Sequence, residues 1–314
     1  MSDSVVHAVA GGAAGIVAIT CTYPLIFLFT RAAVETKNGA KTQSIYHSVA
    51  DVIKREGPWG LYSGLSSSLL GIAFTNSVYY YFYERSRALV QKGKLLSTPE
   101  SILIGLIAGS ATTILSNPIW VVQTSQAVAT MKWEAETSLD PFNPRSVKKL
   151  SIVQTVKSIL AKDGIRAFWR GIGPALVLVI NPVLQYTVFE QLKNALLARR
   201  TAKLRAAGIA AAVAVLSDGD VFLLGALAKL VATSATYPYI VVKSRLQAGH
   251  ARALGYKSSL GGLLTILDEE GVGGLYKGVG SKLVQSVLTA AMLFVGQRRI
   301  YEMAKIAISA KYVF

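Results

Sequence analysis

Three prolines lie within long uncharged stretches of this 314-residue chain, and they constrain its fold more than any other feature. Pro24, Pro118 and Pro238 each follow a tyrosine or asparagine, and the chain turns basic soon after the third of them. A proline inside an apolar helix removes one backbone hydrogen bond and kinks the helix. Kinked helices are common in transport proteins, where broken helices line a cavity. The prolines therefore predict three kinked helices of related sequence.

Apolar runs long enough to cross a bilayer, about 17–25 residues, occur along the whole chain. Only 16% of the residues are charged, against about 25% in an ordinary soluble domain. Four runs lack charges altogether, a fifth contains only Lys229, and a shorter sixth is extended by residues before Lys282. The runs cover residues 8–30, 64–83, 101–131, 171–189, 221–242 and 283–297. We therefore expect six membrane helices.

The formal net charge of +16 has two interpretations. Basic loops can face anionic lipid headgroups, or the charge can attract an anionic substrate. Nucleic-acid binding is not expected, because the basic residues flank apolar spans instead of forming a patch among aromatic residues. The single cysteine, Cys21, allows no internal disulfide and no thiol pair for a metal.

A second motif follows each proline helix and makes the chain a threefold repeat. The motif is an acidic residue, Gly, four residues, an aromatic residue, one residue and Gly. Its copies run from Glu56 to Gly64, from Asp163 to Gly171 and from Glu270 to Gly278. From the proline to the final glycine is 40 residues in the first and third units and 53 in the second, whose extra length falls in residues 132–149.

Each unit is predicted to contain a kinked helix, a polar loop with a short amphipathic helix, the Gly–aromatic–Gly turn and a second membrane helix. The short helices are expected near residues 44–55, 151–162 and 258–269, where apolar residues recur at helical spacing. The units cover residues 1–95, 96–200 and 215–308 of one integral domain. The fold class is therefore an all-α membrane protein with six transmembrane helices in three two-helix repeats.

At this point the chain resembles the mitochondrial carrier family across nearly its whole length. The family signature is Pro-x-acid-x-x-base on the odd-numbered helices, followed by acid-Gly-x4-aromatic-base-Gly. The second half is matched three times, with Ser63 in place of the first base, whereas the first half is degraded. The segments 117–122, 180–182 and 276–285 are similar to the peroxisomal nucleotide-carrier branch of the family. The resemblance implies a pseudo-threefold bundle around a central cavity that opens alternately to the two sides of the membrane.

The resemblance also implies a gate on the odd helices, which the family closes with ion pairs. The gate positions are Pro24, Ile26, Phe29, Pro118, Trp120, Gln123, Pro238, Ile240 and Lys243. Among the positions that carry the family's charges, only Lys243 keeps one. We therefore expect this gate to close by packing of Ile26, Phe29, Trp120 and Ile240, with one hydrogen bond available from Gln123 and Lys243.

The family's second gate uses aromatic-acid-x-x-base on the even helices. Two copies match, with Tyr83, Glu84 and Arg87 in the first unit and Phe189, Glu190 and Lys193 in the second. The third copy offers cations, Arg298 among them, and no acid. We expect a partial ion-pair network; the alternative is a set of interfacial charges that snorkel to the membrane surface.

Polar side chains inside membrane spans are costly and point to function. The candidates for substrate binding are Lys229, Lys282, Gln285, Asn76 and Asn181. Lys229 lies nine residues before Pro238, about 13 Å along a helix, and its repeat counterparts are glycines. The lysines would bind phosphate as point charges, and the asparagines a base or ribose. The alternatives are lipid snorkelling for the lysines and bonding to a kinked backbone for the asparagines.

The sequence contains no catalytic constellation: its three histidines are far apart, and it has neither a phosphate-binding P-loop nor a metal-ligand cluster. We expect no enzyme activity, no cofactor and no metal, so that ATP would be cargo.

We favour a monomeric carrier, embedded in membrane lipid, that exchanges the adenine nucleotides ATP, ADP and AMP across the peroxisomal membrane. The sequence leaves open a related cofactor such as CoA, NAD or FAD. Two other readings remain: a mitochondrial inner-membrane carrier for another anionic metabolite, and a non-transporting scaffold of carrier fold. Buried, unpaired lysines argue against the scaffold.

Overall fold

The computed structural model describes residues 3–34, 49–50, 52–54, 57–91, 97–137, 151–206, 215–249, 258–289 and 292, and within these ranges all regular structure is helical. The long helices are α1 (Asp3–Val34), α3 (Leu65–Gln91), α4 (Thr98–Thr137), α7 (Asn181–Ala206) and α8 (Asp218–Gln247). Residues 279–289 begin a sixth helix. The expected all-α fold is thus confirmed.

Four helical stretches among the described residues are long and apolar enough to cross a membrane. They are Gly15–Val34, Thr98–Ala129, Ile165–Ala206 and Gly219–Gln247. The other two expected spans, residues 64–83 and 283–297, are not among these four, and the reason is different for each. Helix α3 is long enough, at 27 residues or about 40 Å, but its serines and tyrosines make it less apolar. The expected span 283–297 extends beyond the described residues.

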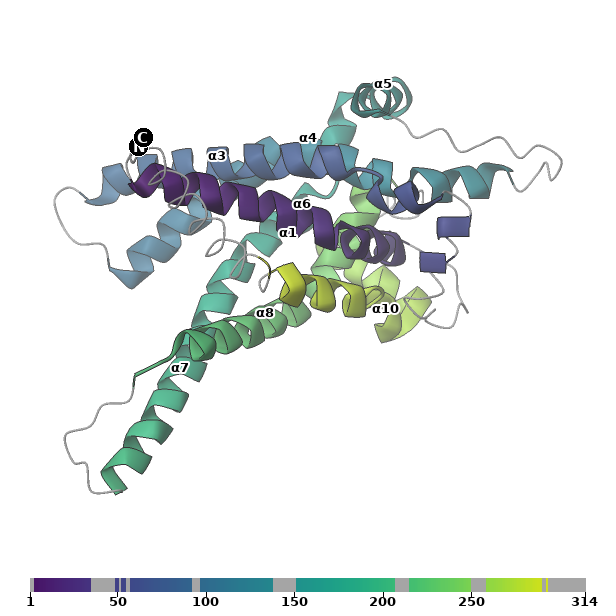
Figure 1. Cartoon of the computed structure of the whole chain (residues 1–314). Helices are drawn as coiled ribbons and strands as arrows, with labels where there is room; N and C mark the ends of the chain where they lie inside the picture. The colour runs from purple at the N-terminus through teal and green to yellow at the C-terminus, as the bar shows by residue number, and fades with distance from the viewer. Residues whose placement is uncertain are drawn as a thin grey trace, which may run out of the picture.

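Each of the three prolines lies inside its long helix, in α1, α4 and α8. Figure 1 shows α1 changing direction along its length. The fourth span is broken by a different proline: α6 (Ile172–Val177) tightens into the 3₁₀ turn η3 (Leu178–Ile180) before α7. Pro182 has no N–H to donate to the carbonyl of Leu178, which explains why the α-helix is interrupted there.

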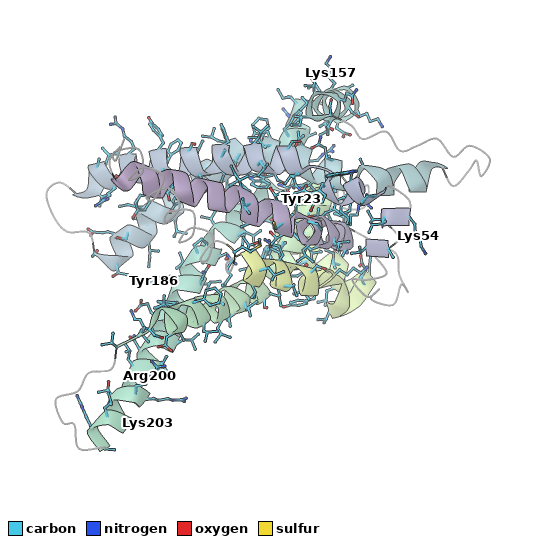
Figure 2. The ribbon with its side chains drawn as sticks, in the orientation of Figure 1. Tyr23, Lys54, Lys157, Tyr186, Arg200 and Lys203 are labelled. Atoms are coloured by element: carbon cyan, nitrogen blue, oxygen red, sulfur yellow. The ribbon has the colours of Figure 1, made fainter. Side chains whose placement is uncertain are left out.

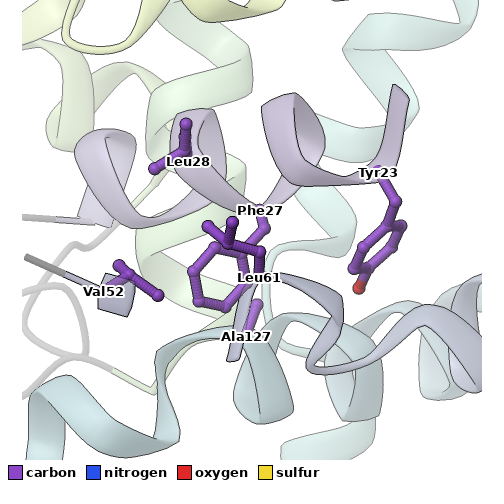
Figure 3. Close-up of a cluster of buried hydrophobic side chains, with 6 residues drawn as sticks. All are labelled: Tyr23, Phe27, Leu28, Val52, Leu61 and Ala127. Atoms are coloured by element: carbon purple, nitrogen blue, oxygen red, sulfur yellow. The ribbon is translucent and has the colours of Figure 1, made fainter. Parts of the chain in front are cut away.

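The short amphipathic helices are present where the chain is described. Helix α5 (Ile152–Asp163) begins with a capping box between Ser151 and Gln154, and Ser258 caps α10 (Ser259–Leu275). In the first unit, residues 49–50 and 52–54 are helical. The first-unit helix is followed by the turn η1 (Pro58–Tyr62), and α5 by the turn η2 (Ile165–Trp169). Figure 3 shows how Val52 and Leu61 pack with Phe27 of α1.

The residue before each proline ties its odd helix to the turn of the same unit. The Tyr23 hydroxyl donates to the carbonyl of Ser63 at 2.8 Å, and the Tyr237 hydroxyl donates to Lys277 at 2.8 Å. In the second unit the Asn117 amide donates to the carbonyl of Arg170 at 3.1 Å. All three acceptors directly precede the final glycine of the motif, so the threefold repeat of the sequence is also a repeat of contacts.

The final glycine of each motif packs against the next unit's odd helix. A Cβ on Gly64 would lie 3.2 Å from the carbonyl oxygen of Gln123, one on Gly171 3.1 Å from that of Lys243, and one on Gly278 3.0 Å from that of Phe29. These three glycines have φ of 90°, 73° and 79°, which side chains other than glycine rarely adopt. Since the third unit contacts the first, the chain closes into a ring.

We predict that Gly278→Ala destabilises the protein more than Gly271→Ala does. Both glycines have positive φ, 79° and 69°, and Gly271, with ψ −171°, is in a region essentially restricted to glycine, so both variants lose about 1–3 kcal/mol from the backbone. Only at Gly278 would the new methyl also meet α1, whereas nothing lies within 4 Å of a Cβ on Gly271. Overpacking adds about 1–3 kcal/mol.

The measurement is the thermal unfolding midpoint of the two purified variants in the same detergent. Equal losses of stability would show that the close approach of the third turn to α1 does not matter to the fold.

Candidate functional site

Two arginines join the odd helices to one another at their C-terminal ends. Arg31 of α1 donates through Nε to the carbonyl of Ala127 in α4 at 2.9 Å, and Arg245 of α8 donates to that of Ala33 in α1 at 3.0 Å. Both arginines lie seven residues after their proline, and both acceptors nine residues after theirs. Figure 1 shows the C-terminal part of α8 reaching α1 and α10.

The second unit has Ser125 at the position of these arginines. The contact between α4 and α8 is made instead by neutral side chains: the Thr124 hydroxyl donates to Gln247 at 3.3 Å, and the Gln247 amide donates to Asn117 at 3.2 Å. The three seams between the odd helices are therefore of two kinds, two with an arginine and one without.

Arg245 is also part of a buried ion pair with Glu270 of α10. Their side chains are 1% and 3% exposed, and Lys277 approaches the same carboxylate at 2.7 Å. Burial alone would raise the pKa of Glu270, but hydrogen bonds from Arg245 and Lys277 outweigh it and hold that pKa below its usual value. Sequence reasoning missed Arg31 and Arg245 as seam residues; their shared spacing from the proline is the signal that could have found them.

The residues expected to gate the odd helices lie around this end of the bundle. Ile26 packs against the Tyr23 cluster and Ile240 against the Tyr237 cluster, while Phe29 is 9% exposed. Trp120 faces Gly71 of α3. The three prolines, Pro24, Pro118 and Pro238, are partly buried in their helices.

The hydrogen bond suggested for Gln123 and Lys243 is not formed. The Gln123 amide instead donates to the Tyr23 hydroxyl at 3.4 Å, because that hydroxyl lies beside it at the same seam. Within the described ranges, Lys243 has neither a hydrogen bond from its ammonium nor an ion pair, and it faces a cavity.

At the opposite end, the charged pairs of the even helices lie within single helices. Glu84 pairs with Arg87 at 3.6 Å, and Glu190 pairs with Lys193 at 2.6 Å, with Lys193 6.0 Å from the Phe189 ring centroid. Arg298 lies outside the described residues. Near this end a bidentate pair between Arg200 and Asp220 joins α7 to α8. Both motif pairs therefore lie within one helix each, whereas the Arg200–Asp220 pair bridges α7 and α8.

A cavity of about 740 Å³ extends between α3, α4 and the α6–α7 span. Its walls include hydroxyl and aromatic side chains, and Lys243 is the one charged residue among the described lining residues. The polar and aromatic lining residues are Thr75, Tyr79, Tyr83, Thr98, Ser101, Thr112, Thr113, Ser116, Trp120 and Tyr186. A mixed apolar and polar cavity of this size suits a small-molecule ligand.

Lys282 begins a polar chain on the sixth helix. Its ammonium donates to Gln285 at 3.0 Å, the Gln285 amide donates to Thr289 at 2.8 Å, and Thr289 lies 3.0 Å from the hydroxyl of Thr22 in α1. The ammonium also lies 4.6 Å above the Phe29 ring, a cation–π distance. Lys282 thus lies beside Phe29, one of the residues expected to gate the odd helices.

Lys229 lies beside the broken fourth span. Its ammonium is 3.4 Å from Asn181 Oδ1, and the Asn181 amide donates to the carbonyl of Ala232 and the hydroxyl of Thr236 in α8. Asn181 therefore bonds to the helix backbone and to Lys229 together. Asn76 is exposed on α3, one residue after the cavity-lining Thr75. None of the five expected substrate residues is among the described lining residues of the cavity.

The threefold contacts, the two ends and the cavity define a solute carrier built from three repeats. The sequence profile of the family described as mitochondrial carrier protein matches residues 2–94, 94–200 and 215–311. The chain belongs to this family.

Its relatives include three named for peroxisomes. The chain is 36% identical to the peroxisomal nicotinamide adenine dinucleotide carrier of Arabidopsis thaliana, over 98% of both chains. It is 35% identical to the peroxisomal membrane protein PMP34 of Mus musculus, over 93% of this chain and 91% of that one. It is 30% identical to PMP47B of Candida boidinii, over 93% and 84%. The chain is accordingly a multi-pass carrier of the peroxisomal membrane.

We predict that Glu270→Gln strongly destabilises the protein, because it leaves the Arg245 guanidinium buried without a full counter-charge. Breaking a buried ion pair typically costs about 3–5 kcal/mol. The matched control is Asp163→Asn, which removes the same motif carboxylate in the second unit. Its partner Arg170 is 3.0 Å away, but the two side chains are 18% and 36% exposed, so the loss is about 0–1 kcal/mol.

Thermal unfolding of both purified variants measures the difference. A loss as large for Asp163→Asn as for Glu270→Gln would contradict the special role of the buried pair.

Proposed function

We propose that this carrier exchanges adenine nucleotides, or a related adenine-containing cofactor, across the peroxisomal membrane by alternating access. The observation that carries the proposal is the group of three intramembrane lysines, Lys229, Lys243 and Lys282. Among the described residues, none of them has a carboxylate partner within ion-pair distance. Uncompensated cations inside a membrane protein are costly, and an anionic substrate would balance them.

The surroundings of the lysines favour a nucleotide over a simple carboxylate. Amide groups of Gln285 and Asn181 lie beside two of the ammonium groups, and the adjoining cavity is lined by threonines and tyrosines. Phosphate, ribose hydroxyls and a planar base each find a matching group there. One relative is named as a carrier of nicotinamide adenine dinucleotide, which contains the same adenosine phosphate unit.

The arrangement of the two ends supports alternating access. The odd helices are joined at one end by Arg31 and Arg245, while the even-helix pairs at the other end remain within their own helices. We propose that the cavity opens at this other end, so that an entering substrate reaches the lysines before the seams of the odd helices. We propose that the expected gate residues act as packing around those seams and that the even-helix charges pair across the cavity when it closes.

The test is transport by the purified chain in lipid vesicles. Vesicles preloaded with ATP should take up labelled ATP, AMP or NAD, without hydrolysis of ATP. Uptake of a carboxylate such as citrate with no nucleotide flux would support a carrier for another anion. Binding without any flux would support a non-transporting protein of carrier fold.

We predict that Lys282→Gln and Lys229→Gln weaken nucleotide binding. A hydrogen bond to a charged group contributes about 1.5–3 kcal/mol, so each variant should lose about 10- to 100-fold in affinity. Lys282→Gln should weaken ATP more than AMP, because ATP leaves more phosphate charge uncompensated. The measurement is the Kd for both nucleotides.

The matched control is Lys157→Gln, the same chemical change at an exposed position of α5 (Figure 2). Its affinities should equal those of the wild type. If Lys282→Gln and Lys229→Gln retain wild-type affinities, or lower stability while the ATP-to-AMP preference stays unchanged, the lysines do not bind phosphate.

A further inference from the structure

An aromatic wall lines the open end of the cavity. Tyr79 and Tyr83 of α3 are one helical turn apart, and their rings stack with centroids 5.8 Å apart and an interplanar angle of 24°. Tyr186 lines the same cavity from α7 (Figure 2). Because Tyr83 belongs to the even-helix gate motif, the wall lies near the open end, away from the arginine seams.

A membrane-interface position alone does not account for these three tyrosines, because all three line the cavity, including Tyr186, which is 49% exposed. Aromatic residues gather at membrane interfaces, where they face the lipid headgroups. Tyr80 and Tyr81 fit that description, since they are 66% and 65% exposed and are not among the described lining residues of the cavity. Tyr79, with Tyr83 one turn later, instead faces the interior from the same helix.

The opposite wall leaves room beside the rings. Gly105 of α4 lines the cavity, and an added Cβ there would lie 3.7 Å from the Tyr79 hydroxyl. One turn before Tyr79, the buried Thr75 hydroxyl has no hydrogen-bond partner within the described part of the chain. This part of the cavity thus combines two stacked tyrosine rings, a glycine beside them at Gly105, and the Thr75 hydroxyl, which has no hydrogen-bond partner among the described residues.

We propose that Tyr79, Tyr83 and Tyr186 form a stacking site that holds the base of the transported nucleotide at the open end of the cavity. Every nucleobase has an aromatic face, and proteins hold unpaired bases by stacking them on tyrosine and other aromatic rings. The unpaired Thr75 hydroxyl supplies a hydrogen bond to the base edge or the ribose.

The position of the lysines sets the orientation of the ligand. Asn181, which contacts Lys229, lies five residues before Tyr186 on α7, or about 7.5 Å along the helix. Lys243 lines the same cavity as the tyrosines and lies two residues before the seam residue Arg245, so a base on the tyrosines directs its phosphates toward Lys243 and the closed end. The tyrosines select for the nucleoside part, whereas the lysines select for charge. This assignment rests on the proposed nucleotide function.

The experiment measures binding of ATP, AMP and NAD to the purified full-length chain by calorimetry. Tyr79→Leu keeps an apolar side chain but removes the aromatic face, so it should weaken each nucleotide that the wild type binds. Loss of base stacking corresponds to about 5- to 150-fold in affinity. Tyr186→Leu should act in the same direction, and Tyr79→Phe, which keeps the ring, should restore near wild-type binding.

Two controls separate stacking from general damage. Tyr80→Leu makes the same change at the neighbouring exposed position and should leave binding unchanged. Tripolyphosphate carries the phosphates of ATP without a base, and its affinity should be the same for Tyr79→Leu and the wild type.

Equal nucleotide affinities for Tyr79→Leu, Tyr186→Leu and Tyr80→Leu would overturn the stacking site and leave the proposed function standing. The same holds if Tyr79→Leu weakens tripolyphosphate as much as ATP. If the wild type binds none of the three nucleotides, the proposed function and the stacking site both fail.

Discussion

The close approach of a glycine turn to the next unit's backbone is the constraint on which the rest of this structure depends. Gly278 lies against the carbonyl of Phe29 in α1. In the same way Gly64 lies against that of Gln123 in α4, and Gly171 against that of Lys243 in α8. A side chain at any of these positions would push an even helix away from the odd helix beside it. The contacts between neighbouring units around the ring therefore depend on this distance.

The arginine seams explain how the fold manages without the signature ion pairs of its family. The side chains at the signature positions are mostly apolar, yet the odd helices still meet, because Arg31 and Arg245 donate to backbone carbonyls of their neighbours. A backbone acceptor cannot be lost by substitution, so this closure tolerates changes that would abolish an ion pair. The Arg245–Glu270 pair then fixes α10 against α8.

Much of the fold could be predicted from the sequence, because repeated spacing and uncharged length each have a direct structural consequence. The three prolines predicted the positions of the odd helices along the chain, and the Gly–aromatic–Gly motif predicted the positions of the turns. The cavity could not be predicted in the same way. Tyr79 and Tyr80 are neighbours of identical chemistry, and only helix packing decides that one lines the cavity while the other is exposed.

The seam between α4 and α8 differs from the other two in a way that bears on how the carrier moves. Ser125 leaves this seam with neutral hydrogen bonds, through Thr124, Gln247 and Asn117, whereas each of the others contains a guanidinium. Lys243 and Trp120, on either side of the same seam, both line the cavity. Opening this seam would break only hydrogen bonds between neutral side chains, whereas opening either of the other two would break a contact of a guanidinium, so the three seams offer unequal resistance to a change of shape.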